Sequence, residues 1–261
     1  MINNLKLKIE KAKIETDPFP HFVIKNFLDN TTVRKLNKIL PDYKDVENKD
    51  VIFQSSSETK KTIMPDSKVF KDLLKIRLFK KVNDNLKKIK PIVLKKFKNH
   101  ILENVNEEFI NSKIKFKMNF ALMRSGYLKS AHLDRRDHLI SGIYYPTSMA
   151  NKGGNLMLCK LKKKHEIFDI FPAKNDLRVK KNYKINDNFI VFFMNVPWAY
   201  HAVSKYNGSK DRKYFYIDYD FNSKISAGTT KNRKKGMNNN KYWKSSVDVK
   251  SLTRKKTFFK E

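Results

Sequence analysis

Two histidines and one aspartate in this sequence have the residue types and the spacing of a metal site. His132 and Asp134 occupy positions i and i+2, and side chains two positions apart on a β-strand point to the same face. His201 follows the strongly strand-like run 188–194, so a neighbouring strand can supply it as a third ligand. Two imidazoles and one carboxylate leave about half of an octahedral coordination sphere open. The sequence therefore predicts an open metal site with these three residues as ligands.

This ligand set is the facial triad of non-haem Fe(II) oxygenases. A lone His-x-Asp is a common chance match, but three further segments support the interpretation. Gly153-Gly154-Asn155-Leu156 follows one predicted strand and opens another. The apolar run 188–194 (NFIVFFM) leads toward His201. Arg212 begins an aromatic strand-like stretch, and a guanidinium there can bind a carboxylate through two parallel N–H bonds.

In this order, the segments resemble the 2-oxoglutarate- and Fe(II)-dependent dioxygenases, in the branch similar to prolyl 4-hydroxylase domains. The resemblance covers residues 18–221 and includes the opening PFPHFVIKNFLD (18–29), His132-x-Asp134, Gly153–Leu156, His201–Val203 and Arg212. It implies a double-stranded β-helix core, also called a jelly roll and similar to cupins. It also implies one Fe(II) and 2-oxoglutarate and O2 as co-substrates. The reaction implied is hydroxylation of a substrate with release of succinate and CO2.

The resemblance assigns roles to individual residues. It implies that iron is held by His132, Asp134 and His201, and that Arg212 binds the distal carboxylate of 2-oxoglutarate. Lys213 is the adjacent cation and an alternative for that role. Because strand side chains alternate, Arg212 falls in phase with Tyr214, and this favours Arg212 over Lys213.

One position departs from the family pattern. The branch often has a tyrosine three residues before the glycine that precedes His-x-Asp. In this chain that glycine is Gly126, and the position holds Met123. Tyr127 and Tyr145 are the two candidates for a hydrogen bond to 2-oxoglutarate in its place.

The surrounding sequence predicts an α+β, mainly β fold. Residues 66–111 carry amphipathic helical patterns, which predict two helices packed on the outer face of a sheet. From residue 114 apolar residues alternate with polar ones, the pattern of a half-buried strand. Short strand candidates follow at 139–145, 155–159, 167–171, 189–194 and 213–221. Short strands at close spacing are typical of antiparallel sandwiches and barrels, so the jelly-roll core is placed at 114–221.

The domain organisation follows from composition. Residues 1–17 are expected to be a charged lead-in, 18–221 the dioxygenase domain, and 222–261 a basic, partly flexible tail. Residues 42–65 are polar and mixed. Within the tail, Trp243 and Phe258-Phe259 indicate segments that dock on the domain or bind a partner.

Charge and cysteine content limit the other functions. The chain has 57 Lys and Arg against 26 Asp and Glu, a formal net charge of +31. Such an excess is explained either by compositional bias toward Lys or by a surface for polyanions such as nucleic acid. The single cysteine, Cys159, excludes an internal disulfide and favours a reducing compartment. Without a signal-peptide pattern or an apolar run of membrane-helix length, a cytoplasmic protein is expected.

Two alternative functions stay open at this point. The same barrel could be a cupin-like metal- or sugar-binding protein without redox chemistry. Alternatively, the basic surface could make the chain a nucleic-acid-binding protein, with binding that falls as salt rises. The substrate of a dioxygenase is also open: a small molecule, a glycan or a peptide residue fits the sequence equally well.

Overall fold

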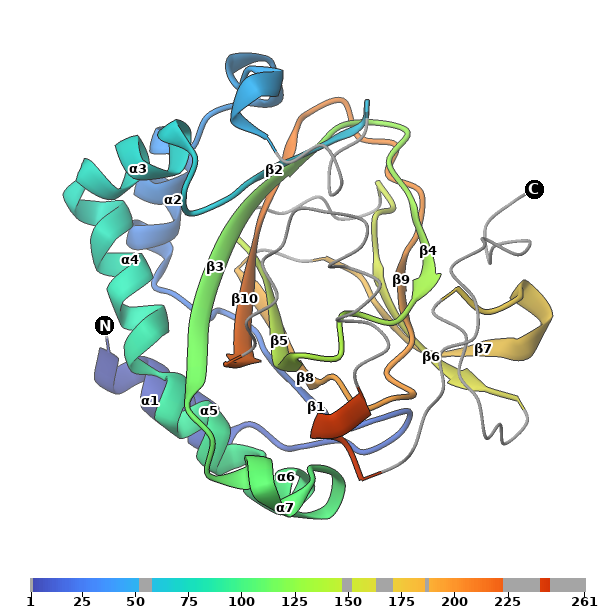
Figure 1. Ribbon diagram of the computed structural model, residues 1–261. Coiled ribbons are helices and arrows are strands. Elements are labelled where there is room, and N and C mark those ends of the chain that lie inside the picture. Colours follow the sequence, from blue (N-terminus) through green and yellow to red (C-terminus); the bar gives the residue numbers. More distant parts are fainter. Residues whose placement is uncertain are drawn as a thin grey trace.

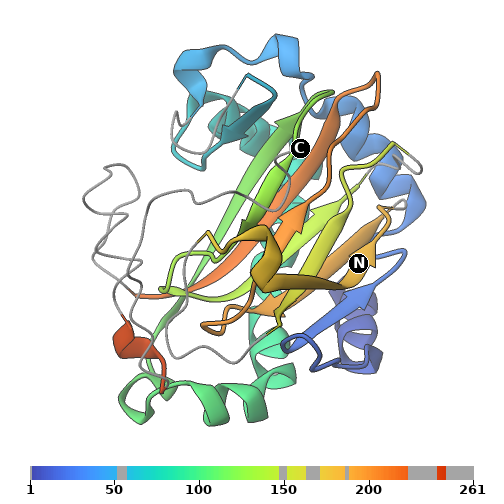
Figure 2. The same cartoon turned by 90° about the vertical axis from the view of Figure 1, so that its right-hand side faces the viewer.

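The computed structural model describes residues 2–51, 58–146, 152–162, 171–185, 188–222 and 240–244. Within these ranges the strands form two antiparallel sheets (Figure 1). The larger sheet has the order β1 (His21–Ile24), β8 (Phe189–Met194), β5 (His138–Tyr145), β10 (Arg212–Phe221), β3 (Ile114–Met123) and β2 (Lys60–Ile63). The smaller sheet has the order β4 (Lys129–His132), β9 (His201–Val203), β6 (Leu156–Leu161) and β7 (Leu177–Tyr183). In Figure 2 the long strands β3 and β10 run side by side across the molecule.

The helices come mainly from the N-terminal part of the chain. They are α1 (Ile2–Lys11), α2 (Asn30–Ile39), α3 (Lys68–Lys75), α4 (Arg77–Lys88), α5 (Lys90–Lys96), α6 (Lys98–Asn104) and α7 (Glu107–Ile110). Side-chain oxygens cap two of them: Asp29 accepts from the Thr32 N–H before α2, and Ser67 accepts from the Phe70 N–H before α3. The segment 66–111, predicted as two helices, forms five shorter helices, α3 to α7. The backbone of Ile76 between α3 and α4 is extended, which ends the first of them.

The helices cover the outer face of the larger sheet, as the sequence predicts (Figure 1). The ring of Phe79 in α4 lies 6.1 Å from that of Phe215 in β10. The Tyr219 hydroxyl donates to the Leu86 carbonyl at 3.3 Å. These contacts leave the opposite face of the sheet turned toward the smaller sheet.

Strand register decides which side chains of the larger sheet face inward. Lys60, Met123 and Arg212 are aligned across β2, β3 and β10, and they share one face. Lys61 and Lys213 belong to the next row, which points to the outer side, where the Lys61 ammonium donates to the Tyr43 carbonyl at 3.0 Å. This alternation determines the cations that reach the space between the sheets.

The predicted lead-in (1–17) and the predicted tail (222–261) both contain segments that pack on the rest of the protein. The predicted charged lead-in contains α1, which buries Leu5 and Ile9 and contacts α5. Near the C-terminus, Trp243 is 2% exposed, and its indole N–H donates to the Arg136 carbonyl at 3.0 Å. This docked segment lies beside α6 and α7 in Figures 1 and 2.

Other sequence predictions fall partly or wholly outside the described residues. Most of the strand candidate 167–171 and most of the tail, including Phe258-Phe259, are among them. The polar stretch 42–65 contains β2 in its described part. None of the helices in the described ranges has the length and apolar character needed to cross a bilayer.

Candidate metal centre

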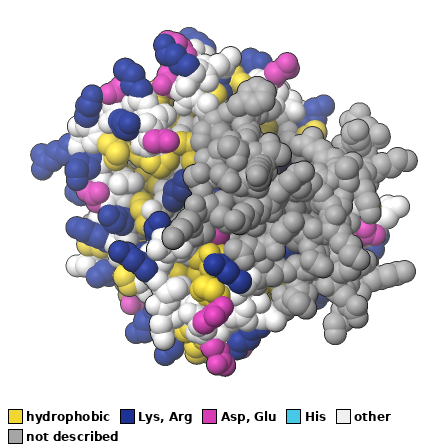
Figure 3. All heavy atoms as spheres, viewed as in Figure 1, with side chains coloured by type: hydrophobic (Ala, Val, Ile, Leu, Met, Phe, Trp, Pro, Cys, Tyr) yellow, Lys and Arg dark blue, Asp and Glu magenta, His cyan; other side chains and the backbone are white. Residues whose placement is uncertain are grey.

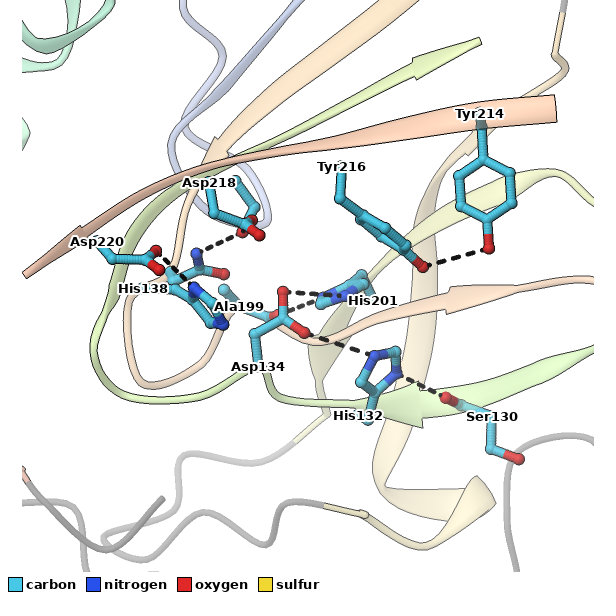
Figure 4. A network of polar contacts seen from close by, with 12 residues as sticks. Ser130, His132, Asp134, His138, Ala199, His201, Tyr214, Tyr216, Asp218 and Asp220 are labelled. Atoms are coloured by element: carbon cyan, nitrogen blue, oxygen red, sulfur yellow. Dashed lines mark hydrogen bonds and ion pairs between the residues drawn. The ribbon is translucent and has the colours of Figure 1, made fainter. Parts of the chain in front are cut away.

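The three predicted metal ligands meet between the two sheets. His132 ends β4, His201 begins β9, and the two are directly paired across the antiparallel ladder. Asp134 lies just beyond the end of β4. One ligand atom from each of the three residues lies within 4.8 Å of the others. Asp134 Oδ1 is 3.7 Å from His132 Nε2, and its Oδ2 is 3.6 Å from His201 Nε2 (Figure 4).

Backbone carbonyls fix the orientation of both imidazoles. His132 Nδ1 lies 2.9 Å from the Ser130 carbonyl, and His201 Nδ1 lies 3.0 Å from the Ala199 carbonyl (Figure 4). A carbonyl oxygen only accepts, so Nδ1 carries the hydrogen in each ring, and Nε2 is left with its lone pair. In both rings the lone pair is therefore on Nε2, the nitrogen nearest Asp134. A metal ligand needs this tautomer, with the hydrogen on Nδ1.

The surroundings favour the protonation states of a metal site. Burial, with the neighbouring His201 side chain as a smaller contribution, holds the pKa of His132 well below its usual range. Burial alone would raise the pKa of Asp134, but its interactions with the side chains of His201 and His132 outweigh burial and lower that pKa. A neutral imidazole and an ionised carboxylate bind a cation without first losing a proton.

A second charged group, Arg212, is buried on the inner face of β10. Its side chain is 0% exposed, and its Nη1 donates to the Gly154 carbonyl and, at 3.5 Å, to the Gly153 carbonyl. Nε and Nη2 have no hydrogen-bond partner among the described residues. A buried guanidinium with two unpaired N–H groups is unfavourable, and a bidentate carboxylate is the ligand that satisfies both.

The double glycine makes room for this guanidinium. A Cβ on Gly154 would lie 2.0 Å from Arg212 Nη1, and a Cβ on Gly153 would lie 2.0 Å from the Lys205 carbonyl oxygen. Both glycines also have positive φ, +67° and +72°, which larger residues rarely adopt. The Gly153-Gly154 motif found in the sequence thus allows the backbone to approach the Arg212 side chain closely.

Lys213, the alternative cation, points away from this space. Its ammonium is 2.7 Å from Asp42 Oδ1 and donates to the Leu40 carbonyl at 2.7 Å. Strand alternation separates the two neighbouring cations, so only Arg212 of this pair lies on the inner face.

Tyrosines line the inner face between Arg212 and the metal centre. Tyr145, a predicted candidate, lies under the Arg212 guanidinium at 4.7 Å and stacks on Tyr214 at 5.7 Å. The hydroxyls of Tyr214 and Tyr216 are 3.4 Å apart (Figure 4). Tyr127, the other candidate, is buried, and its hydroxyl interacts with that of Tyr214. Burial raises the pKa of Tyr145 to about 12, so its phenol is a hydrogen-bond donor at neutral pH.

Three polar residues near the site, Tyr214, Tyr216 and Lys60, were not predicted from sequence as site residues. Tyr214 and Tyr216 share the phase of Arg212 on β10, and that phase was the available signal. Lys60 donates to the Tyr216 hydroxyl at 3.2 Å, but its polar local sequence gave no indication of a site. His138 pairs with Asp220 at 2.6 Å on the Asp134 side of the centre (Figure 4).

Comparisons with known proteins give structural neighbours only. No protein-family model and no curated protein matches the sequence. A prolyl 4-hydroxylase from Pseudomonas putida is 12% identical with a TM-score of 0.47, over 85% of this chain and 100% of its own. A viral collagen prolyl hydroxylase from Paramecium bursaria Chlorella virus-1, in complex with 2-oxoglutarate, is 13% identical with a TM-score of 0.45, over 80% and 99%. A prolyl 4-hydroxylase from Phytophthora capsici is 11% identical with a TM-score of 0.49, over 87% and 68%.

All three neighbours are prolyl hydroxylases. They belong to the class that the sequence motifs resemble. Identities this low and TM-scores below 0.5 transfer neither activity nor substrate to this chain, so its function has to be argued from the site.

Proposed function

We propose that this chain is an Fe(II)- and 2-oxoglutarate-dependent dioxygenase that hydroxylates its substrate. In this proposal the two facing sheets are a double-stranded β-helix, with its core at residues 114–221 in a domain that spans 18–221. One observation carries the proposal: an inward-facing His-Asp-His cluster lies in the same space as a buried guanidinium with two unpaired N–H groups.

The three ligands fit a hexacoordinate metal ion. Two bonds of about 2.1 Å around one ion span at most roughly 4.2 Å, and Asp134 lies within that distance of both histidine Nε2 atoms. Two imidazoles and one carboxylate are the donor set of non-haem Fe(II) oxygenases. His132, Asp134 and His201 would hold the ion.

The Arg212 guanidinium and the tyrosines beside it suit 2-oxoglutarate. Arg212 would bind the distal carboxylate through Nε and Nη2, the two N–H groups that lack a protein partner. Tyr145 and Tyr127 are protonated donors near that carboxylate, and either could add a hydrogen bond. This assigns the carboxylate to Arg212 rather than to Lys213, which is paired with Asp42.

When bound, Fe(II) and 2-oxoglutarate supply the oxidation, in which O2 is reduced, 2-oxoglutarate becomes succinate and CO2, and one oxygen atom enters a C–H bond of the substrate. The protein would bind and orient the metal ion and the co-substrate and shield them from solvent. The Ser130 and Ala199 carbonyls keep the imidazoles in the ligating tautomer. The Phe193 ring packs against the His201 ring, with centroids 4.9 Å apart, and helps to hold that imidazole in place. Arg212 fixes one end of the co-substrate and so its orientation.

The test requires no substrate. Purified protein is mixed anaerobically with Fe(II), 2-oxoglutarate is added, and the weak visible metal-to-ligand charge-transfer band is recorded. We expect a band that needs both components, disappears in His201→Ala and persists in His100→Ala. His100 is a matched control because it lies on α6, paired with Glu103. Bound metal without a band would reject the dioxygenase in favour of a cupin-like binder.

The alternative functions account for less of the structure. A metal- or sugar-binding protein without redox chemistry has no need for both the cluster and the unpaired Arg212 N–H groups. A nucleic-acid-binding protein would concentrate its charge on one surface. In Figure 3, Lys and Arg side chains are instead scattered over the visible described face, with Asp and Glu between them.

A further inference from the structure

Lys60 places a further basic group on the inner face, beside Tyr216. Its ammonium donates to the Tyr216 hydroxyl at 3.2 Å. It also lies 5.1 Å from the Tyr216 ring centroid and 5.8 Å from that of Tyr127. The neighbouring Lys61 points to the other face of β2, where its ammonium contacts backbone carbonyls. The inward position of Lys60 therefore follows from the register of β2 on β3.

Lys60 reaches toward the candidate metal centre through Tyr216, whose hydroxyl accepts its hydrogen bond and whose side chain lies on the same inner side as His201 and Asp134 (Figure 4). Burial is the main cause that lowers the pKa of Lys60 to about 7, and the positive charge of Lys129 acts in the same direction. Asp134 opposes both. No carboxylate in the described part of the chain pairs with Lys60. Lys129 begins β4, the strand that His132 ends, and its charge contributes to lowering the pKa of His132.

A charge balance shows what this arrangement lacks once the site is loaded. The two positive charges of Fe(II) and the one of Arg212 equal the single negative charge of Asp134 and the two of 2-oxoglutarate. The charges of the metal ion and Arg212 therefore cancel those of 2-oxoglutarate and Asp134. The Asp134 carboxylate is then no longer available to compensate the charge of Lys60. Two other acids nearby, the buried Asp218 and the partly buried Asp220, interact with Ser141 and His138 instead. The Lys60 amino group, whose ammonium form is disfavoured by burial, is then left without an anionic partner among the described residues.

We propose that the substrate carries an anionic group, a carboxylate or a phosphate, which Lys60 binds beside the metal centre. This inference rests on the proposed function. Lys60 would donate to the anion together with the Tyr216 hydroxyl, and Lys129 would add long-range attraction. Charged hydrogen bonds in a partly buried site contribute strongly to affinity. Lys60 thus selects substrates by charge, whereas the triad and Arg212 bind the metal ion and 2-oxoglutarate, which every turnover requires.

Lys60 could instead bind the co-substrate, but the site already provides for both of its carboxylates. Arg212 offers two unpaired N–H groups to the distal one, and the metal ion neutralises the near one. The substrate is the remaining reactant without a cation, and the experiment separates the two assignments.

The experiment uses the full chain loaded anaerobically with Fe(II) and 2-oxoglutarate. Acetate and, separately, inorganic phosphate are titrated in at constant ionic strength, and the charge-transfer band is followed. We expect one of them to perturb the band saturably, which distinguishes a carboxylate from a phosphate. In Lys60→Met its affinity should fall about tenfold or more, while 2-oxoglutarate affinity changes less than twofold. Lys61→Met is the matched control and should bind the anion as the wild type does.

The outcomes separate this inference from the proposed function. Equal anion binding in Lys60→Met and the wild type would overturn the anionic-substrate assignment. So would a loss of 2-oxoglutarate affinity in Lys60→Met, because Lys60 would then serve the co-substrate. If the wild type forms no band, the proposed function fails. The anion site is then decided by acetylation of Lys60 with acetic anhydride, measured by mass spectrometry: phosphate or acetate slows it if the site exists and has no effect otherwise.

Discussion

Replacing Arg212 by methionine should abolish tight binding of 2-oxoglutarate and leave the metal site intact. Each hydrogen bond to a charged group contributes about 1.5–3 kcal/mol, and Arg212 has two N–H groups without a partner among the described residues. Even the lower end of that range, about 3 kcal/mol for two bonds, corresponds to a weakening of more than 100-fold. We therefore expect the dissociation constant for 2-oxoglutarate to rise about 100- to 1,000-fold.

The assay is an anaerobic titration of the Fe(II)-loaded protein with 2-oxoglutarate, followed by the charge-transfer band and by calorimetry. Lys213→Met is the control and should shift the affinity less than twofold, because Lys213 pairs with Asp42 on the other face of the sheet. Stability should change by no more than about 1 kcal/mol, since the lost bonds to glycine carbonyls are offset by removal of a buried, partly unpaired charge. Unchanged affinity in Arg212→Met, or a large loss in Lys213→Met, would refute the assignment.

Three further predictions follow from neighbouring parts of the structure. Burial lowers the pKa of His138, but nearby carboxylates, led by Asp220, outweigh it and raise that pKa to about 10. Its stabilisation should be complete below pH 6.5 and lost toward pH 10, so urea unfolding of His138→Asn and wild type should differ at pH 6 and converge by pH 10. Trp243→Ala should lower the free energy of unfolding by about 3–5 kcal/mol in denaturant titrations; a loss under 1 kcal/mol would mean that the docked segment is not part of the folded unit. Gly154→Ala should displace the Arg212 guanidinium and weaken 2-oxoglutarate binding about tenfold or more in calorimetry, because the added Cβ would lie 2.0 Å from Nη1.

The parts of the site that sequence could predict are those governed by strand periodicity. Alternation placed Arg212 and Tyr214 on one face and Lys213 on the other, and the register of β10 on β3 has that arrangement. The spacing of His132 and Asp134 predicted that they lie together, although Asp134 follows the strand rather than belonging to it. Pairing with a distant strand was inferred only from the apolar run before His201.

The parts that sequence missed depend on contacts between distant segments. Lys60 lies on an edge strand of four residues, KKTI, which is held by its pairing with β3 and has no strong pattern of its own. Leu5 and Ile9, four residues apart, are the buried residues of α1, and the lysines around them gave the appearance of a lead-in. Short, lysine-rich segments of this kind are stabilised by tertiary packing rather than by local propensity.

The direct pairing of His132 with His201 has a consequence for folding. The two ligands are far apart in sequence, so a bound metal ion would act as a removable cross-link that closes a long loop of the chain. Because such an ion binds the native state and not an unfolded one, free metal at 100 times its dissociation constant would add about 2.7 kcal/mol to the free energy of unfolding. Chelation would then loosen the β4–β9 pair first, and protease sensitivity there would report metal occupancy.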